Sequence, residues 1–357
     1  MKSAPKTVVV GEGWAALGAL ARLLQDSREE PAGEIHWVSG SGGRVIPPFA
    51  SIESAEAATL LEELCAGLDL SLGERVEGSS FVREFRNRSF REPVWTKGVD
   101  LEEKRSIRAV ELWAPETALV PVEEVRWEPS LVEIEEQVRE RLLGHSRIRR
   151  IAGVPVEGFK VDSGRVEAVV FGSGEELAAD QVIYADRWSS LSRLSGLPKA
   201  LSWMRGRDPM GVLQVIFNHS SAIRPDVQEG FFATLNRDSG DAQDRQVFGH
   251  FYREGHESIW TTAVTPEEGE DNHLVAKRLR KMKQSLEKMF ANSEWAPGEF
   301  GATIKNEQVR FEEGVILASG EIPKHPIKIE KGAQAISGIQ FVTDGYGVGP
   351  ALASVWV

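Results

Sequence analysis

The sequence has little cysteine and no excess of positive charge. Its 357 residues include one cysteine, Cys65, and carry a formal net charge of −12. A single cysteine excludes an internal disulfide and a thiolate metal cluster, and it is typical of a reducing compartment, so we expect a cytoplasmic protein without a metal ion. An acidic chain lacks the cationic surface that nucleic acid requires. The sequence also lacks an apolar run of about 18 residues, so we expect no transmembrane segment.

The N-terminal region carries the pattern of a nucleotide-binding turn. Residues 7–10 are β-branched without polar alternation, which is typical of a strand buried on both faces of a parallel sheet. Gly11, Gly13 and Ala16 follow, and a helical segment comes next. In this arrangement the first glycine permits a tight turn, the second lets backbone approach a pyrophosphate, and the small residue lets helix pack on strand. The pattern predicts a phosphate site at the helix start; a tight turn without a ligand is the alternative.

A second candidate strand, residues 35–38, ends in Ser39 and leads into Gly42, Gly43 and Arg44. In a dinucleotide fold this strand usually ends in a carboxylate that binds the adenosine ribose. Losing such a charge-assisted bond weakens binding by about 1.5–3 kcal/mol. We therefore expect weakened ribose recognition and retained phosphate recognition, and we expect Ser39→Glu to tighten nucleotide binding.

The rest of the chain alternates between two kinds of pattern. Residues 128–144 predict an amphipathic helix, and short strands with turns at 162–164 and 172–174 follow it, ending in the buried strand 181–185. The alternating apolar and polar segments within residues 201–310 predict a half-exposed antiparallel sheet, and an apolar face at helical spacing then predicts a long amphipathic helix. The chain closes with a strand at 339–342, a glycine turn and a helix, which repeats the N-terminal arrangement.

Four blocks of the sequence, in this order, resemble those of a flavoprotein superfamily: the amine oxidases, phytoene desaturases and protoporphyrinogen oxidases. The blocks are VVVGEGWAALGA (8–19), GGR (42–44), ADQVIYAD (179–186) and GIQFVTDGYGVGPALAS (338–354). The resemblance implies FAD as cofactor and an α/β fold, with a Rossmann-like FAD-binding domain and an inserted α+β substrate domain on a mixed or antiparallel sheet. We accordingly assign residues 1–50, 140–200 and 311–357 to the FAD-binding domain, and residues 51–139 and 201–310 to the substrate domain.

The resemblance also assigns cofactor contacts. It places the pyrophosphate at Gly11, Gly13, Ala15 and Ala16, the phosphate and flavin side at Gly42, Gly43 and Arg44, and the adenine at Val156. It places the base of the dinucleotide at Ala185, the ribityl or phosphate region at Asp344, and the flavin ring at Gly347 and Val348; Gly345, in the turn after Asp344, is also a cofactor-binding residue. Ser39 stands where the family has its ribose-binding acid. No catalytic residue is assigned, because in flavin chemistry the cofactor itself is the electron sink.

Three functions are consistent with these patterns. The resemblance implies an FAD-dependent oxidoreductase that takes hydride from a C–N or C–C bond of a small or medium organic substrate. The neutral Ser39 suggests an alternative, a flavoprotein fold with weakened or lost cofactor binding that acts as a non-catalytic binding or scaffold subunit with a protein partner or as a homodimer. A third is an NAD(P)-binding enzyme in which Arg44 takes a 2′-phosphate; the C-terminal strand–glycine–helix unit argues against it.

Overall fold

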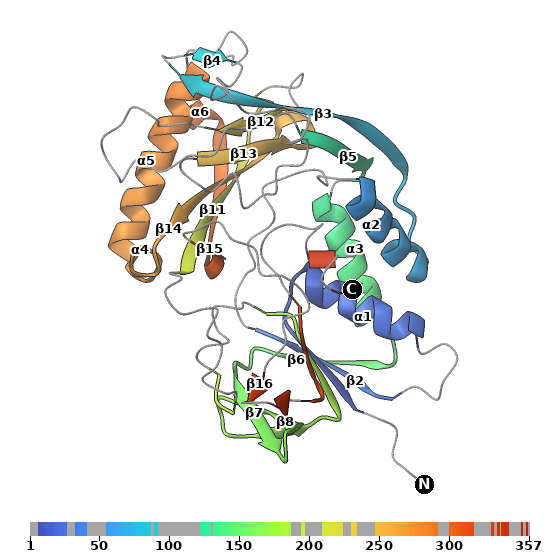
Figure 1. The fold of residues 1–357 in the computed structure, drawn as a ribbon. Coiled ribbons are helices and arrows are strands. Elements are labelled where there is room, and N and C mark those ends of the chain that lie inside the picture. The colour runs from blue at the N-terminus through green and yellow to red at the C-terminus, as the bar shows by residue number, and fades with distance from the viewer. Residues whose placement is uncertain are drawn as a thin grey trace, which may run out of the picture.

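The computed structural model describes residues 6–26, 33–40, 55–86, 89–91, 122–129, 131–186, 194–196, 209–223, 230–233, 247–291, 300–317, 330–331, 334–335, 337–342, 351–352 and 355. Two large sheets organise this part of the chain: a five-stranded parallel sheet and an eight-stranded mixed sheet (Figure 1). The predicted α/β class is confirmed.

The parallel sheet is assembled from strands far apart in the sequence. Its order is β18-β10-β1-β2-β6, and every neighbouring pair is parallel. The bounds are β1 Thr7–Val10, β2 Ile35–Ser39, β6 Ile148–Ala152, β10 Gln181–Tyr184 and β18 Ile339–Phe341. Every residue of β1 and β2 is buried, as expected for strands covered on both faces. The strands predicted at 7–10, 35–38, 181–185 and 339–342 are confirmed.

Helices α1 (Trp14–Asp26) and α3 (Leu131–Leu143) cover one face of the parallel sheet, and α2 (Ala55–Gly67) packs on α1 beyond them (Figure 1). The predicted apolar face of α3 is buried, through Leu131, Ile134, Val138 and Leu142. Ala351, Leu352 and Val355, within the helix predicted at the C-terminus, are helical and join the same core. Helix α2 falls within residues 51–139, which we assigned to the substrate domain, and α3 crosses the assigned boundary at residue 139. Both helices share a core with α1, and the division into domains stays a proposal.

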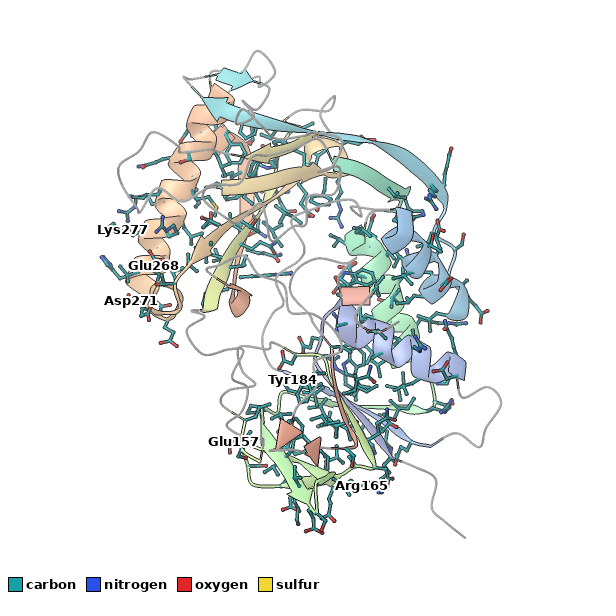
Figure 2. The ribbon with its side chains drawn as sticks, in the orientation of Figure 1. Glu157, Arg165, Tyr184, Glu268, Asp271 and Lys277 are labelled. Atoms are coloured by element: carbon teal, nitrogen blue, oxygen red, sulfur yellow. The ribbon has the colours of Figure 1, made fainter. Side chains whose placement is uncertain are left out.

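A small antiparallel sheet covers the opposite face. It consists of β7 (Val156–Asp162), β8 (Arg165–Phe171) and β9 (Glu176–Ala178). Tyr184, labelled in Figure 2, links the two sheets, since its ring centroid lies 6.0 Å from that of Phe159 and 5.8 Å from that of Phe341. The two predicted turns are confirmed, with positive φ at Ser163, Gly164 and Gly174.

The mixed sheet has the order β15-β11-β14-β13-β12-β3-β4, and β5 also pairs with β3. Its pairs are antiparallel except β12 with β3. The bounds are β3 Glu74–Arg86, β4 Ser89–Arg91, β5 Val122–Glu128, β11 Pro209–His219, β12 Gly230–Ala233, β13 Val247–Tyr252, β14 Glu257–Val264 and β15 Ile304–Leu317. The antiparallel pairing predicted within residues 201–310 is confirmed for the described residues. The predicted half-exposure is wrong for β11 and β14, which are largely buried because α5 (Asn272–Ala291) packs on one face and Val132 of α3 on the other. Strand β15 continues the sheet to residue 317, beyond the boundary that we placed at 310.

Helix α5 (Asn272–Ala291) covers the outer face of the mixed sheet (Figure 1). Met282 and Leu286, on its predicted apolar face, are buried against β11, β13 and β14. The remaining short elements are α4 Pro266–Glu270, α6 Phe300–Thr303, the 3₁₀ turn Arg253–Gly255, β16 Glu330–Lys331 and β17 Gln334–Ala335. Within the described ranges no helix is both long and apolar enough to cross a membrane.

Helix α3 joins the two sheets. Val132, on the side of α3 away from the parallel sheet, packs against Ile216, Tyr252 and Ile259 of the mixed sheet. Val212 of β11 joins the core between the parallel sheet and the β7–β9 sheet. The inner face of the mixed sheet is therefore held next to the nucleotide half of the chain.

One histidine is enclosed in the core beneath α5. The ring of His219 hydrogen-bonds through Nε2 with Ser258 Oγ at 2.8 Å and through Nδ1 with Thr303 Oγ1 at 3.0 Å. The ring of Phe300 lies edge-on to it at 5.2 Å. Burial and, to a smaller extent, the nearby His256 lower the pKa of His219 to about 4. The neutral imidazole therefore belongs to the folded state.

We expect His219 to contribute to unfolding in acid. Because its folded-state pKa lies below its ordinary value of 6.5, the stability it contributes is complete above that value and is lost as pH falls towards 4. The glutamine of the His219→Gln variant does not titrate. When the pH is lowered from about 7.5 to about 4.5, the free energy of unfolding of this variant should therefore fall less than that of the unmodified protein. Urea denaturation at both pH values measures this. The exposed His273 provides the control, and equal slopes for His219→Gln and His273→Gln would contradict the assignment.

Candidate nucleotide site

The turn after β1 brings Gly11 into backbone contact with Ala185. Gly11 has φ +134°, and a Cβ on it would lie 2.4 Å from the Ala185 carbonyl oxygen. Its N–H donates to the Val38 carbonyl at 3.0 Å, and the Ala185 N–H donates to the Val10 carbonyl at 2.7 Å. Gly11 and Ala185, which were assigned from distant blocks of the sequence, therefore meet at the carboxyl ends of β1 and β10. Only glycine fits at position 11.

Helix α1 begins at the turn. The Leu17 N–H donates to the Gly13 carbonyl at 2.9 Å, which is the first hydrogen bond of the helix. The amides of Trp14, Ala15 and Ala16 therefore have no acceptor within the helix. The first turn of α1 carries no acidic residue. Ala15 and Ala16 are buried against the sheet, so the helix approaches it closely. The positive end of the helix dipole and these amides form an anion site of the dinucleotide type.

Two side chains hold the carbonyl groups of the turn. The indole Nε1 of the buried Trp37 donates to the Gly11 carbonyl at 2.7 Å. Arg139 of α3 donates through Nη2 to the Glu12 carbonyl at 2.7 Å and pairs with Glu135 at 3.0 Å. With both carbonyls occupied inside the protein, the turn is fixed before any ligand binds. Sequence reasoning missed both residues, because nothing in their local pattern indicates contact with the turn.

The ribose end differs from expectation. Ser39, the last residue of β2, is fully buried, and its Oγ accepts a hydrogen bond from Arg150 Nε at 3.0 Å. The Arg150 guanidinium also lies 5.6 Å from the centre of the Trp37 ring. Sequence reasoning named Ser39 but missed Arg150, which comes from β6. The expectation that Ser39→Glu tightens binding needs revision, because a glutamate here would meet the guanidinium before it met a ribose.

Val156, the residue assigned to adenine, lies near the turn and near Ser39. Val156 begins β7 and packs, half-buried, against the cluster that contains Val10 and Val38, the residues next to the turn and to Ser39. Its assigned contact with adenine stays a prediction. Gly42, Gly43, Arg44, Asp344, Gly345, Gly347 and Val348 lie outside the described residues.

The site fits the phosphates of a dinucleotide better than it fits an unmodified ribose. The cradle at Gly11 would be filled by any Cβ, and it lies beside the amides of α1, whose first turn carries no acidic side chain. Glu12 is the acidic residue of the preceding turn. At the end of β2, a hydroxyl and a guanidinium stand where ribose hydroxyls usually find a carboxylate. Within the described ranges no group of histidine, cysteine and acidic side chains could hold a metal ion.

No protein-family model matches the sequence, and no curated protein matches it. Solved structures do match over nearly the whole chain. An oxidoreductase from Methanosarcina mazei has a TM-score of 0.57 at 14% identity, with 98% of this chain and 99% of that chain covered. A geranylgeranyl bacteriochlorophyll reductase-like protein from Thermoplasma acidophilum has a TM-score of 0.55 at 14% identity, with 99% and 76% covered.

A glycerol-3-phosphate dehydrogenase from Bacillus halodurans, solved in complex with FAD, has a TM-score of 0.52 at 12% identity, with 99% of this chain and 63% of that chain covered. The chain has the fold of the FAD-binding flavoproteins. Identities this low establish a shared fold and not a shared reaction. None of the three is named as an amine oxidase or a phytoene desaturase, so that finer resemblance stays a proposal.

The hydrogen bond from Trp37 to the turn can be measured with a pair of matched variants. Trp37→Phe leaves the buried Gly11 carbonyl without its donor and should lower the free energy of unfolding by about 1–3 kcal/mol beyond the effect of lost ring volume. Trp14 is equally buried, and its Nε1 makes no hydrogen bond in the described part of the chain. Trp14→Phe therefore removes similar volume without that cost. Equal losses in urea denaturation would show that the bond does not stabilise the turn.

Proposed function

We propose that this protein is an FAD-dependent oxidoreductase that takes hydride from a C–N or C–C bond of a small or medium organic substrate. The observation that carries the proposal is the Gly11 cradle at the ends of β1 and β10, opening onto the start of α1 within a flavoprotein fold. The finer assignment, to the branch of amine oxidases and phytoene desaturases, rests on the four sequence blocks.

The described residues have distinct tasks in this proposal. When bound, FAD supplies the electron sink for hydride removal. Gly11, Gly13 and the first amides of α1 hold its pyrophosphate, and Trp37 and Arg139 keep the turn in shape. The inner face of the mixed sheet, packed on α3 through Val132, forms the wall that shields the reacting region from water. The substrate is a small molecule in the cytoplasm.

A second candidate is a non-catalytic binding or scaffold subunit that has a protein partner or forms a homodimer. One observation favours it: the end of β2 presents Ser39 and Arg150, and no carboxylate, to the ribose. Without the acid, FAD loses a bond worth about 1.5–3 kcal/mol. The two candidates differ in whether bound flavin is reduced by a substrate.

Thermal unfolding with added ligands tests the cofactor. FAD at about 100 times its dissociation constant should stabilise the protein by about 2.7 kcal/mol and raise its melting temperature. Riboflavin is the matched control, since it has the same ring without the pyrophosphate and adenosine that the cradle holds, and it should give little shift.

The visible spectrum provides a second readout for the same prediction. Protein that stays colourless after incubation with FAD, and whose melting temperature FAD does not raise, is not an FAD enzyme. Stoichiometric bound flavin that no electron donor from a panel of amines and unsaturated compounds reduces would favour the non-catalytic candidate.

A further inference from the structure

The guanidinium of Arg150 is held in place at the ribose end of the site by two contacts. Its Nε donates to Ser39 Oγ at 3.0 Å, and its guanidinium carbon lies over the Trp37 ring, 5.6 Å from the ring centre. These contacts use one of the five N–H donors of the side chain. Arg150 makes no other hydrogen bond in the part of the chain that the structure describes, and the residue is exposed. Its terminal nitrogens are therefore available to a ligand.

The charge of Arg150 is also uncompensated, unlike that of its neighbours. Arg139, on the same Trp37 ring at 5.7 Å, pairs with Glu135 at 3.0 Å. Arg149, the preceding residue on β6, pairs with Glu34 at 2.9 Å. No described carboxylate lies within 4.0 Å of the Arg150 guanidinium. A guanidinium that is held in place and has no ion-pair partner among the described residues can bind an anion.

The position of Arg150 specifies the anion. Ser39 is the last residue of β2, and Arg150, at the middle of the neighbouring parallel strand β6 and opposite Trp37, reaches it from there, so the contact lies at the carboxyl end of β2. Ligands of open α/β sheets bind beyond these ends, and the end of the second strand meets the adenosine ribose. A carboxylate there binds the 2′-hydroxyl, whereas an arginine nearby accommodates a 2′-phosphate.

We propose that Arg150 is the specificity-determining residue of the adenosine subsite and that, with Ser39, it selects nucleotides whose ribose carries a 2′-phosphate. The planar fork of an arginine matches phosphate oxygens, and bonds in which both partners are charged are the stronger ones. An unphosphorylated ribose, as in FAD, offers Arg150 only neutral hydroxyl oxygens as hydrogen-bond acceptors. The inference shares with the proposed function the assumption that this turn binds an adenine nucleotide.

Calorimetric titration with three small nucleotides tests the proposal. The probes are adenosine 5′-monophosphate, adenosine 2′,5′-bisphosphate and adenosine 3′,5′-bisphosphate, the last of which carries equal charge at a different position. The unmodified protein should bind the 2′,5′-bisphosphate about tenfold or more tightly than the monophosphate, and more tightly than the 3′,5′-isomer. Arg150→Met, which keeps an unbranched stem over Trp37, should abolish both preferences. Arg150→Lys should keep part of the preference for the 2′,5′-bisphosphate over the monophosphate, because lysine retains the positive charge but lacks the planar guanidinium.

Arg149→Met is the matched control. It removes the same charge from the adjacent, ion-paired residue of β6, so both preferences should survive it. The proposal is overturned if the unmodified protein does not distinguish the three nucleotides, if the 2′-preference survives Arg150→Met, or if Arg149→Met weakens it equally. Circular dichroism of each variant establishes that the fold is retained.

FAD titrated in parallel separates this inference from the proposed function. Tight FAD binding without any 2′-phosphate preference overturns the inference and leaves the function in place. A 2′-phosphate preference lost in Arg150→Met, together with no FAD binding, supports the inference and overturns FAD as the cofactor. Absence of binding by FAD and by all three nucleotides overturns both, because the turn then holds no nucleotide.

Discussion

The close approach of Gly11 to Ala185 is the constraint on which the nucleotide half of the protein depends. A Cβ at Gly11 would overlap the backbone of Ala185, so β1 and β10 lie side by side up to their last residues only because this position is glycine. The same turn then directs the chain into α1, whose buried alanines let the helix lie close to the sheet. One absent side chain thus fixes strand pairing, helix placement and the position of the phosphate site together.

Trp37 extends that constraint to the rest of the site. Its indole N–H fixes the Gly11 carbonyl, and the guanidinium groups of Arg139 of α3 and Arg150 of β6 both lie over its ring. Each arginine in turn bonds one part of the site, the phosphate turn or Ser39. Each cation–π contact contributes about 0.5–1 kcal/mol at exposed positions and more where water is excluded. The phosphate end and the ribose end are therefore supported by one side chain, and a change at Trp37 affects both.

Patterns that depend on neighbouring residues could be predicted from the sequence. The buried β-branched run of β1, the glycine turn and the apolar face of α3 follow from local periodicity and backbone sterics. The resemblance assigned Gly11 and Ala185 to the same dinucleotide, but their backbone contact was not predicted. Arg139 and Arg150 could not be predicted, because their contacts with Glu12 and Ser39 span 127 and 111 residues. The placement of α2 and α3 on the nucleotide side likewise depends on packing that no local pattern specifies.

The absence of an acid at the end of β2 is consistent with its surroundings. A carboxylate at Ser39 would be fully buried and would lie against the Arg150 guanidinium, so it would form an ion pair instead of accepting ribose hydroxyls. Ser39 and Arg150 are therefore one unit: the hydroxyl fixes Nε, and the small side chain leaves room for the fork. If the protein had merely lost ribose recognition, the replacement of the carboxylate by Ser39 would be enough, and Arg150 would not be needed. The proposed preference for a 2′-phosphate rests on the remaining observation, a guanidinium stacked on a buried indole with no carboxylate beside it among the described residues.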